Sequence, residues 1–490
     1  MKRKLYIIII LTLFLSSCSK FLETSPDQRA ELDTPEKIAE LITSAYPQAN
    51  YIPFMEAASD NAGDKGAGRS SNDPLNMNPW KYMDIDSRDL DSPTFYWYQA
   101  YKAIAAANHA LQAIERLGLN AQTRPLKGEA LIARAYAHHM LIILFSKSYN
   151  PSSADTDPGI PYVTVPEHEV LKKYERKTVQ YVYEMIEKDI VEGMPLLDDS
   201  RFMVPKFHFT KSAAHAFAAR FYLFKQDFKK SAEHAEASLG NDLKIYIRPI
   251  NSPALIQMEY FTKQQWYTGP DNPSNLLVVE VPTIWGRTYP GNRYGMTFKI
   301  YNDLFLKGNI TSGIYNYSFF GGSDLVLHTP KFKEHFVTSS VNSTYGVPYN
   351  MLPILTVDEL LLNWAEALAE LGQYDKAIGL LNDFISHKVV FDNYTTVYVP
   401  ELHNLHPSKI NVYYGSQDLR ENIIKTVLDF KRVEFIFEGL RWFDIVRKNI
   451  VVEHVSFDEK ETYYLESNSL KRMFQLPPEV ISSGIQPNPR

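Results

Sequence analysis

Cysteine is nearly absent from this sequence, because Cys18 is the single one among 490 residues. One cysteine excludes an intrachain disulfide framework and any metal site built from several cysteines. An excess of charge is also missing: the formal net charge at pH 7 is only -6, which argues against a nucleic-acid partner. After Leu15 the sequence has no apolar run long enough to cross a bilayer as a helix. The bulk of the chain is therefore expected to fold outside the membrane.

The N-terminus, MKRKLYIIIILTLFLSSCSK, has the features of a bacterial export signal. Basic residues precede an apolar stretch, Leu5 to Leu15, that is too short to span a bilayer. Small residues follow, and Leu15-Ser16-Ser17-Cys18 resembles a bacterial lipobox, in which the cysteine is lipidated. We predict a signal peptide over 1–17 and a lipidated tether over 18–30. An ordinary signal peptide with an incidental cysteine is the alternative.

Helical patterns dominate the rest of the chain, which is 45% hydrophobic and 13% aromatic and can form a sizeable core. The first helix is expected to begin at Pro35, with Asp33 or Thr34 as its cap. Apolar periodicity predicts further helices over 95–117, 128–147 and 177–192. The helix over 128–147 is apolar over most of its circumference and should be buried.

Two stretches, 218–239 and 363–385, have the residue spacing of tetratricopeptide-like helical hairpins. Small residues in such a hairpin let two helices approach closely, and aromatic residues fill the gaps. The alternative is any antiparallel helix pair. Because the two stretches lie far apart in the sequence, we do not expect a simple tandem array. The predicted fold is mainly α, with helical hairpins packed against a loop-rich region that has a few short strands.

The loop-rich region is expected over 241–350, between a mainly helical part (31–240) and a C-terminal helical part (351–490). Residues 276–282, LLVVEVP, read as a strand. Residues 59–93 form another long stretch rich in Gly, Asn, Asp, Ser and Pro, and long loops in compact chains are usually functional.

Aromatic residues in these loops are the candidate ligand site. Flat rings can stack on the C–H faces of sugars, and polar neighbours can bond hydroxyl or peptide groups. The alternative is that Trp80 or Trp285 packs its loop onto the scaffold. The predicted ligand-binding residues are Asn78, Trp80 and Tyr82 in the first loop, and Trp285, Arg287, Tyr289, Asn292 and Tyr294 in the second.

Residues 434–447, EFIFEGLRWFDIVR, pose a question about catalysis. Glu434 and Glu438 lie one helical turn apart if 423–448 is one helix, and paired carboxylates can hydrolyse a glycosidic bond. On that helix the charges pair three residues apart: Glu438 with Arg441, Arg441 with Asp444, and Asp444 with Arg447. Neighbouring arginines keep carboxylates ionised, whereas a glycosidase needs one carboxyl protonated. The pattern favours a structural salt-bridged strut over a catalytic pair.

The same segment carries a family resemblance. KRVEFIFEGLRWFDIVRKN resembles the C-terminal signature of the SusD/RagB family of outer-membrane nutrient-binding lipoproteins. Other matching segments are GEALIARAYAHHMLIILF, TVDELLLNWAEAL and FQLPPEVISSGIQPNP. The signature residues are Arg432, Glu434, Phe435, Glu438, Gly439, Arg441, Asp444 and Arg447.

The resemblance implies one SusD-like domain over 31–490, lipid-anchored at Cys18 on the outside of the outer membrane. It implies a partner, a SusC-like TonB-dependent transporter, and a ligand that is a glycan or, in some branches, a peptide. It implies no catalysis, cofactor, metal or nucleic acid. A surface glycosidase using Glu434 and Glu438, and a scaffold that binds only proteins, stay as alternatives.

Overall fold

The computed structural model describes residues 32–68, 72–167, 174–340, 343–391 and 397–490. The predicted signal peptide, Cys18 and the tether lie outside the described residues. The helices are α3 Pro35–Ile42, α4 Ile52–Ala58, α5 Pro74–Trp80, α6 Pro93–Leu117, α7 Thr123–Phe145, α8 Val179–Gly193, α9 Lys211–Phe224, α10 Phe228–Leu239, α11 Pro253–Gln257, α12 Tyr260–Thr268, α13 Trp285–Thr288, α14 Phe298–Tyr301, α15 Val357–Glu370, α16 Tyr374–Ser386, α17 Pro400–His403, α18 Pro407–Tyr414, α19 Leu419–Glu434, α20 Arg441–Arg447 and α21 Pro478–Ser482. The strands are β1 Gly63–Asp64, β2 Asn275–Pro282, β3 Tyr294–Gly295, β4 Ile314–Tyr315, β5 His335–Thr338, β6 Gly346–Thr356, β7 Val389–Val390, β8 Val452–Val455 and β9 Thr462–Leu465.

The predicted helices are present, and their starts follow from capping. The Thr34 side chain accepts a hydrogen bond from the Lys37 amide at 3.3 Å, so Thr34 caps α3 and Pro35 is its first residue. Ser92 caps α6 in the same way, through the Phe95 amide at 3.0 Å. No helix among the described residues is long and apolar enough to cross a membrane.

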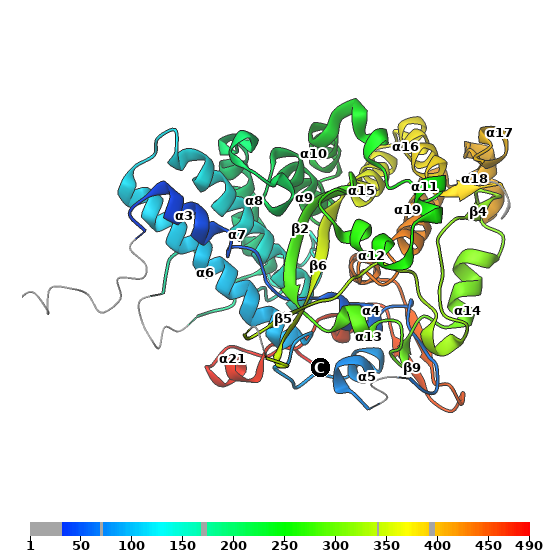
Figure 1. Cartoon of the computed structure of the whole chain (residues 1–490), viewed down its shortest axis with the longest axis horizontal. Helices are drawn as coiled ribbons and strands as arrows, with labels where there is room; N and C mark the ends of the chain where they lie inside the picture. The colour runs from blue at the N-terminus through cyan, green and yellow to red at the C-terminus, as the bar shows by residue number, and fades with distance from the viewer. Residues whose placement is uncertain (1–31, 69–71, 168–173, 341–342, 392–396) are drawn as a thin grey trace, which may run out of the picture.

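The two predicted hairpins are α9–α10 and α15–α16, and they stack on each other although they lie far apart in the sequence. Helix α15 packs against α9 and α10 on one side and against α16 and α19 on the other. Together with α6, α7 and α8 they form a row of helices that runs from left to right in Figure 1. Helix α7 is buried along nearly its whole length, as its apolar circumference predicts.

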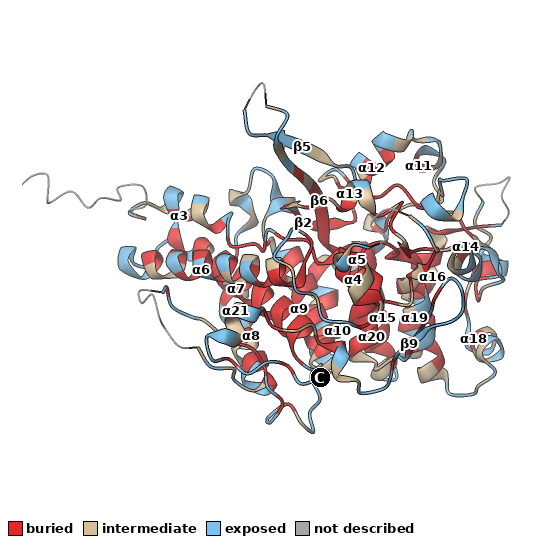
Figure 2. Cartoon of the chain, turned by 90° about the horizontal axis from the view of Figure 1, so that it is seen from below, coloured by how far each residue is buried: buried red, intermediate tan, exposed pale blue. Residues whose placement is uncertain are grey.

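Strands are few and short, and they bring distant segments together. The one sheet of three strands among the described residues is antiparallel, in the order β2-β6-β5, and its end at β5 projects from the body with exposed residues (Figure 2). The pair β1–β3 places Gly63 opposite Gly295 and so joins the two loops of the predicted ligand site. The long stretch 59–93 is not wholly irregular, because it contains β1 and α5.

The prediction of one helix over 423–448 is wrong. Helix α19 ends at Glu434, and α20 begins at Arg441 after a turn in which Phe437 and Gly439 have φ angles of 68° and 72°. The buried carboxylate of Glu56 holds this turn, because it accepts hydrogen bonds from the Phe437 amide at 2.8 Å and the Gly439 amide at 2.9 Å. A Cβ atom at Gly439 would lie 3.1 Å from Cα of Ile52, so the turn fits tightly against α4.

Candidate functional site

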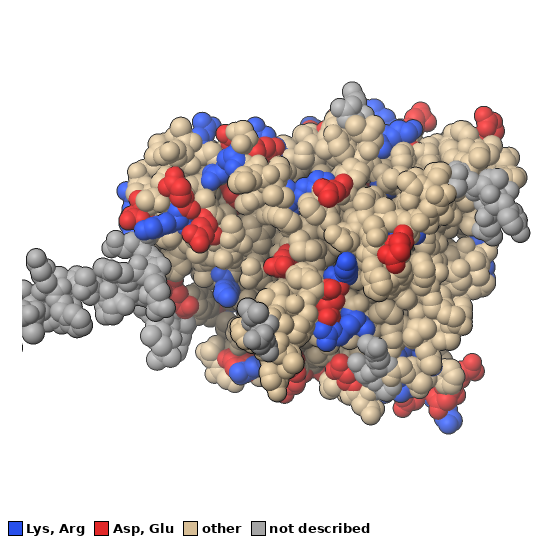
Figure 3. Space-filling model, in the orientation of Figure 1, with Lys and Arg blue, Asp and Glu red and all other residues tan. Residues whose placement is uncertain are grey.

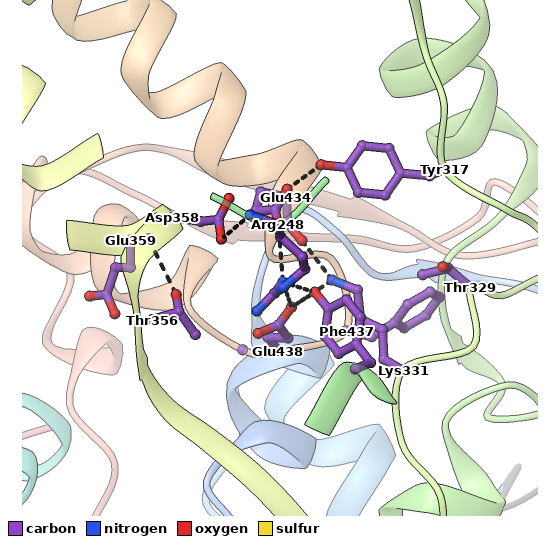
Figure 4. A network of polar contacts seen from close by, with 12 residues as sticks. Arg248, Tyr317, Thr329, Lys331, Thr356, Asp358, Glu359, Glu434, Phe437 and Glu438 are labelled. Atoms are coloured by element: carbon purple, nitrogen blue, oxygen red, sulfur yellow. Dashed lines mark hydrogen bonds and ion pairs between the residues drawn. The ribbon is translucent and has the colours of Figure 1, made fainter. Parts of the chain in front are cut away.

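The two acids of the supposed catalytic pair are part of a buried ion network (Figure 4). Glu434 Oε1 accepts a hydrogen bond from Arg248 at 2.8 Å, and Glu434 Oε2 lies 2.9 Å from Lys388 Nζ. Glu438 Oε1 lies 2.6 Å from Lys331 Nζ, and it accepts a hydrogen bond from Tyr267 at 2.6 Å.

This network balances its own charge. Lys388 Nζ also binds Asp358 at 2.6 Å, so three buried cations face three buried carboxylates. Arg248 lies between the two glutamates, with Nη1 3.9 Å from Oε1 of Glu438. A glycosidase needs two accessible carboxyls, one of them protonated. Glu434 and Glu438 are 0% and 3% exposed and bound by cations, so the geometry is that of a structural network.

The other signature residues make ion pairs that differ in part from those predicted. Asp444 pairs with Arg447 at 2.6 Å, as expected. Arg441 is not placed beside Glu438, because the chain turns between α19 and α20; it instead binds both carboxylate oxygens of Asp60 at 2.9 Å. Arg447 also donates hydrogen bonds to both carboxylate oxygens of Glu366, at 2.5 and 2.6 Å.

These contacts shift the pKa values of the acids. Burial alone would raise the pKa of Asp60, but the neighbouring charges of Arg432 and Arg441 lower it to about 2. The pKa of Glu366 is held well below its ordinary value, because Arg447 and Lys448 outweigh the effect of its burial. Both carboxyls therefore stay ionised at neutral pH, as structural ion pairs do.

The two predicted ligand loops meet in the structure. The Asn76 side chain bonds the backbone of Tyr294 on both sides, donating to its carbonyl at 2.9 Å and accepting from its amide at 3.1 Å. The ring of Trp80 stacks on that of Tyr294, with centroids 4.5 Å apart. His454, from β8, stacks on two rings of the first loop. The centroid of its ring lies 4.9 Å from that of Trp80 and 5.1 Å from that of Tyr82.

The aromatic rings predicted to bind the ligand are much less exposed than a flat binding platform would be. Each ring packs against other rings or the backbone and exposes little of its surface. Their exposed fractions are 0% for Trp80, 7% for Tyr82, 3% for Trp285, 1% for Tyr289 and 4% for Tyr294. Trp80 and Trp285 thus pack their loops onto the scaffold, and Trp80 and Tyr294 also line a cavity.

Trp285 and Tyr289 fasten the second loop to the signature turn. Trp285 Nε1 donates to the carbonyl of Phe437 at 3.3 Å, and the ring of Tyr289 packs edge-on against that of Phe437 at 5.2 Å.

The polar residues predicted for the site are also buried or bonded to other residues of the protein. Asn292 is buried, and Asn78 donates to the carbonyl of Asp84 at 2.9 Å. Arg287 is exposed and forms a two-fold ion pair with Glu334.

A cavity of about 500 Å³ opens where the two loops meet the hairpin β8–β9. Trp80, Tyr294 and Phe457 line the cavity, and of these three rings Phe457 is the exposed one, at 65%. The cavity thus combines one exposed ring with cationic and anionic side chains, a mixture that suits a ligand rich in hydroxyl groups. Its polar rim consists of Asp64, Lys81, Arg293, Ser456, Asp458, Lys460 and Glu461.

Asp64 fixes the shape of this cavity. Its carboxylate binds Arg293 at 2.7 and 2.8 Å and accepts hydrogen bonds from the amides of Gly66, at 2.8 Å, and Phe457, at 3.1 Å. Burial would raise the pKa of Asp64, but these bonds outweigh it and lower the pKa below its ordinary value. One ionised carboxylate therefore ties both loops to the C-terminal hairpin.

On the opposite rim, Lys81 lies above the ring of Tyr463 and 3.8 Å from Glu461. The hydrogen bond that Lys81 donates to Tyr463, together with the nearby Glu461, raises the pKa of Lys81, so it is a cation at neutral pH. Sequence reasoning missed Lys81, Arg293 and Phe457. Lys81 and Arg293 directly follow or precede predicted residues, and Phe457 lies in SFDEKET, a polar turn between short alternating stretches.

No group of three or more His, Cys, Asp or Glu side chains in the described ranges is arranged to hold a metal ion. On the face seen in Figure 3, acidic and basic side chains are interspersed without a large area of either sign.

Comparisons with known proteins agree with this architecture. A family model described as "Starch-binding associating with outer membrane" matches residues 20–223, and the model of the SusD family matches residues 327–480. "SusD-like protein P2" of Formosa agariphila is 25% identical over 393 residues, which cover 72% of this chain and 71% of that protein.

Solved structures share the fold. A putative sugar binding protein from Bacteroides vulgatus has a TM-score of 0.68 at 19% identity and covers 94% of this chain and 99% of its own. A laminarin binding SusD-like protein has a TM-score of 0.56 at 16% identity, with coverages of 93% and 98%. At such identities the likeness shows the fold alone. The two family matches together span well over half of the sequence, and they show that the chain belongs to the SusD/RagB family.

Proposed function

We propose that this protein is a cell-surface nutrient-binding lipoprotein, which captures a glycan and delivers it to a SusC-like TonB-dependent transporter in the outer membrane. The observation that carries the proposal is the cavity between the two loops and the β8–β9 hairpin. Its size suits a few sugar rings, and its rim offers hydrogen-bond donors on Lys81 and Arg293 beside acceptors on Asp458 and Glu461.

Family membership supports the same role. The family description names starch binding and association with the outer membrane, and a structural neighbour binds laminarin. The buried and neutralised pair Glu434–Glu438 argues against the alternative of a surface glycosidase. Attachment through a lipid on Cys18 would hold the cavity at the cell surface, where the transporter could receive the ligand.

Native gel electrophoresis with polysaccharides cast into the gel tests this role. We expect laminarin, starch or another neutral glycan to retard the protein, and no reducing ends to appear on prolonged incubation. Release of reducing ends would favour the glycosidase. Failure of every glycan, together with binding of a mixed peptide pool in calorimetry, would favour the peptide-binding alternative.

The partner and the anchor can be tested in the native host. Affinity purification from detergent-solubilised outer membranes should recover a large TonB-dependent barrel with the protein. The variant Cys18→Ala should leave the membrane fraction in a strain that lacks that transporter. Recovery without any barrel protein, or membrane retention of the variant, would contradict the proposal.

A further inference from the structure

A second cavity lies between α6, the segment 161–167 and the C-terminal residues that include α21. Its volume is about 210 Å³, and it shares no lining residue with the proposed glycan cavity. Helix α6 supplies its floor through Trp97, Tyr101 and Ile104, which follow the spacing i, i+4, i+7 of one helix face.

Two walls of the cavity are each held by separate hydrogen bonds. Tyr101 donates to the carbonyl of Pro161 at 2.8 Å, and Asn108 donates to that of Val163 at 3.0 Å, which fixes the 161–167 wall along α6. Asn488 donates to the carbonyls of Phe145 and Phe474 at 3.0 and 2.8 Å, which fixes the C-terminal wall. The cavity is therefore preformed, as small-molecule sites usually are.

The walls are aromatic and aliphatic. Besides Trp97 and Tyr101, the rings of Tyr98 and Tyr174 line the cavity, together with Val480. An apolar cavity of about 150 Å³ is enough to hold benzene, so this one has room for a larger flat ring.

Hydroxyl groups at the cavity already have partners. Tyr98 donates to Glu479 at 3.0 Å, Tyr101 bonds Pro161, and Tyr174 bonds the Glu167 carboxylate. A sugar would bury several hydroxyls here without enough partners, which is costly. This cavity therefore differs in chemistry from the proposed glycan site.

One charged side chain, that of Glu167, is among the described residues that line the cavity. Aromatic rings attract cations through their faces, and a carboxylate at the rim adds to that attraction. We propose that this cavity binds a small ligand in which a flat aromatic ring carries a cationic amine, with the ring against Trp97 and Tyr101 and the ammonium group at Glu167.

Three probes with the same ring and different charge test the proposal: tryptamine, indole and indole-3-acetate, titrated into the full chain by calorimetry at low ionic strength. We expect tryptamine to bind about fivefold or more tightly than indole, and indole-3-acetate to bind least. The variant Glu167→Gln should bring the affinity for tryptamine down to that for indole.

Ala105 lines the cavity and is exposed, so Ala105→Trp should fill the space without disturbing the core. Lys102→Trp, also exposed on α6 but outside the cavity, is the matched control. We expect Ala105→Trp to abolish tryptamine binding and Lys102→Trp to leave it unchanged, with glycan retardation the same in both. Absence of tryptamine binding, equal affinity for all three probes, or unchanged affinity in Ala105→Trp would overturn the proposal.

Discussion

Single charged residues decide how the signature segment is stabilised. Arg441 is 9% exposed and binds Asp60 through two hydrogen bonds, across more than 370 residues of sequence. A second cation, Arg432, forms an ion pair with Asp60 at 3.4 Å. The pair connects α20 to the end of α4, next to the loop that carries Asp64.

Arg441→Met should lower the free energy of unfolding by about 2–3 kcal/mol, because Asp60 loses its closest charge-assisted hydrogen bonds. Urea denaturation measures the change. Arg490→Met is the control, since Arg490 pairs with Asp84 at the surface and such pairs contribute up to about 1 kcal/mol. Equal effects of the two substitutions would contradict the structural role of Arg441.

The lowered pKa of Asp60 predicts that the protein loses stability in acid. This pKa is about 2 in the folded state against an ordinary value of 3.8, so the unfolded chain binds more protons between these values. The stabilisation is complete above pH 3.8 and is lost as the pH falls through 2. It amounts to at most about 2 kcal/mol. Asp60→Asn should therefore be less stable than the wild type at pH 6, and the difference should shrink at pH 2.5. A difference that does not depend on pH would contradict this assignment.

The burial of individual aromatic residues could not be predicted from the sequence. Polar neighbours of Trp80 and Trp285 indicated loops with exposed rings. Their burial depends on His454 and on the carbonyl of Phe437, both more than 150 residues away. No local pattern in the sequence indicates such contacts, so the burial of these rings could not be predicted from it.

At the scale of elements, the turn between α19 and α20 determines where the signature acids point. The turn places Glu434 and Glu438 around Arg248 and leaves Arg441 to reach Asp60. Gly439 is the position at which the turn touches α4, with a positive φ and a close approach to Ile52.

Gly439→Ala should destabilise the protein by about 2–3 kcal/mol, because the left-handed conformation is strained for alanine and the added carbon meets the α4 backbone. Gly415→Ala is the control: Gly415 has a φ of 64° but open space around it, so the cost should be about 1 kcal/mol. Thermal unfolding of both variants gives the comparison. If Gly415→Ala cost as much, the contact with α4 would have no part in the effect.

Helices and hairpins were predictable because their signals are local. Thr34 followed by Pro35 marks the start of α3, and small residues at repeat spacing mark α9–α10 and α15–α16. The break after Glu434 was not predictable, because apolar periodicity continues through it. What stops the helix is the Glu56 carboxylate, which bonds the amides of Phe437 and Gly439 from the far end of the chain.

At the scale of the whole molecule, stacked hairpins form a frame, and the loops and short strands are packed against it (Figure 1). Figure 2 shows the buried residues concentrated along the inner helices, such as α9 and α15, and in the middle of β2 and β6. The proposed glycan cavity lies where three segments from different parts of the chain meet, and Asp64 ties them together.

Calorimetry with the glycan that retards the protein in gels tests this cavity most directly. Phe457 and Tyr464 are exposed rings of the same β8–β9 hairpin, and only Phe457 is among the residues that line the cavity. Phe457→Ala should weaken binding by about 2 kcal/mol, a loss of more than tenfold in affinity, while Tyr464→Ala should bind as the wild type does. Unchanged affinity in Phe457→Ala, or an equal loss in Tyr464→Ala, would contradict the assignment of the glycan site to this cavity.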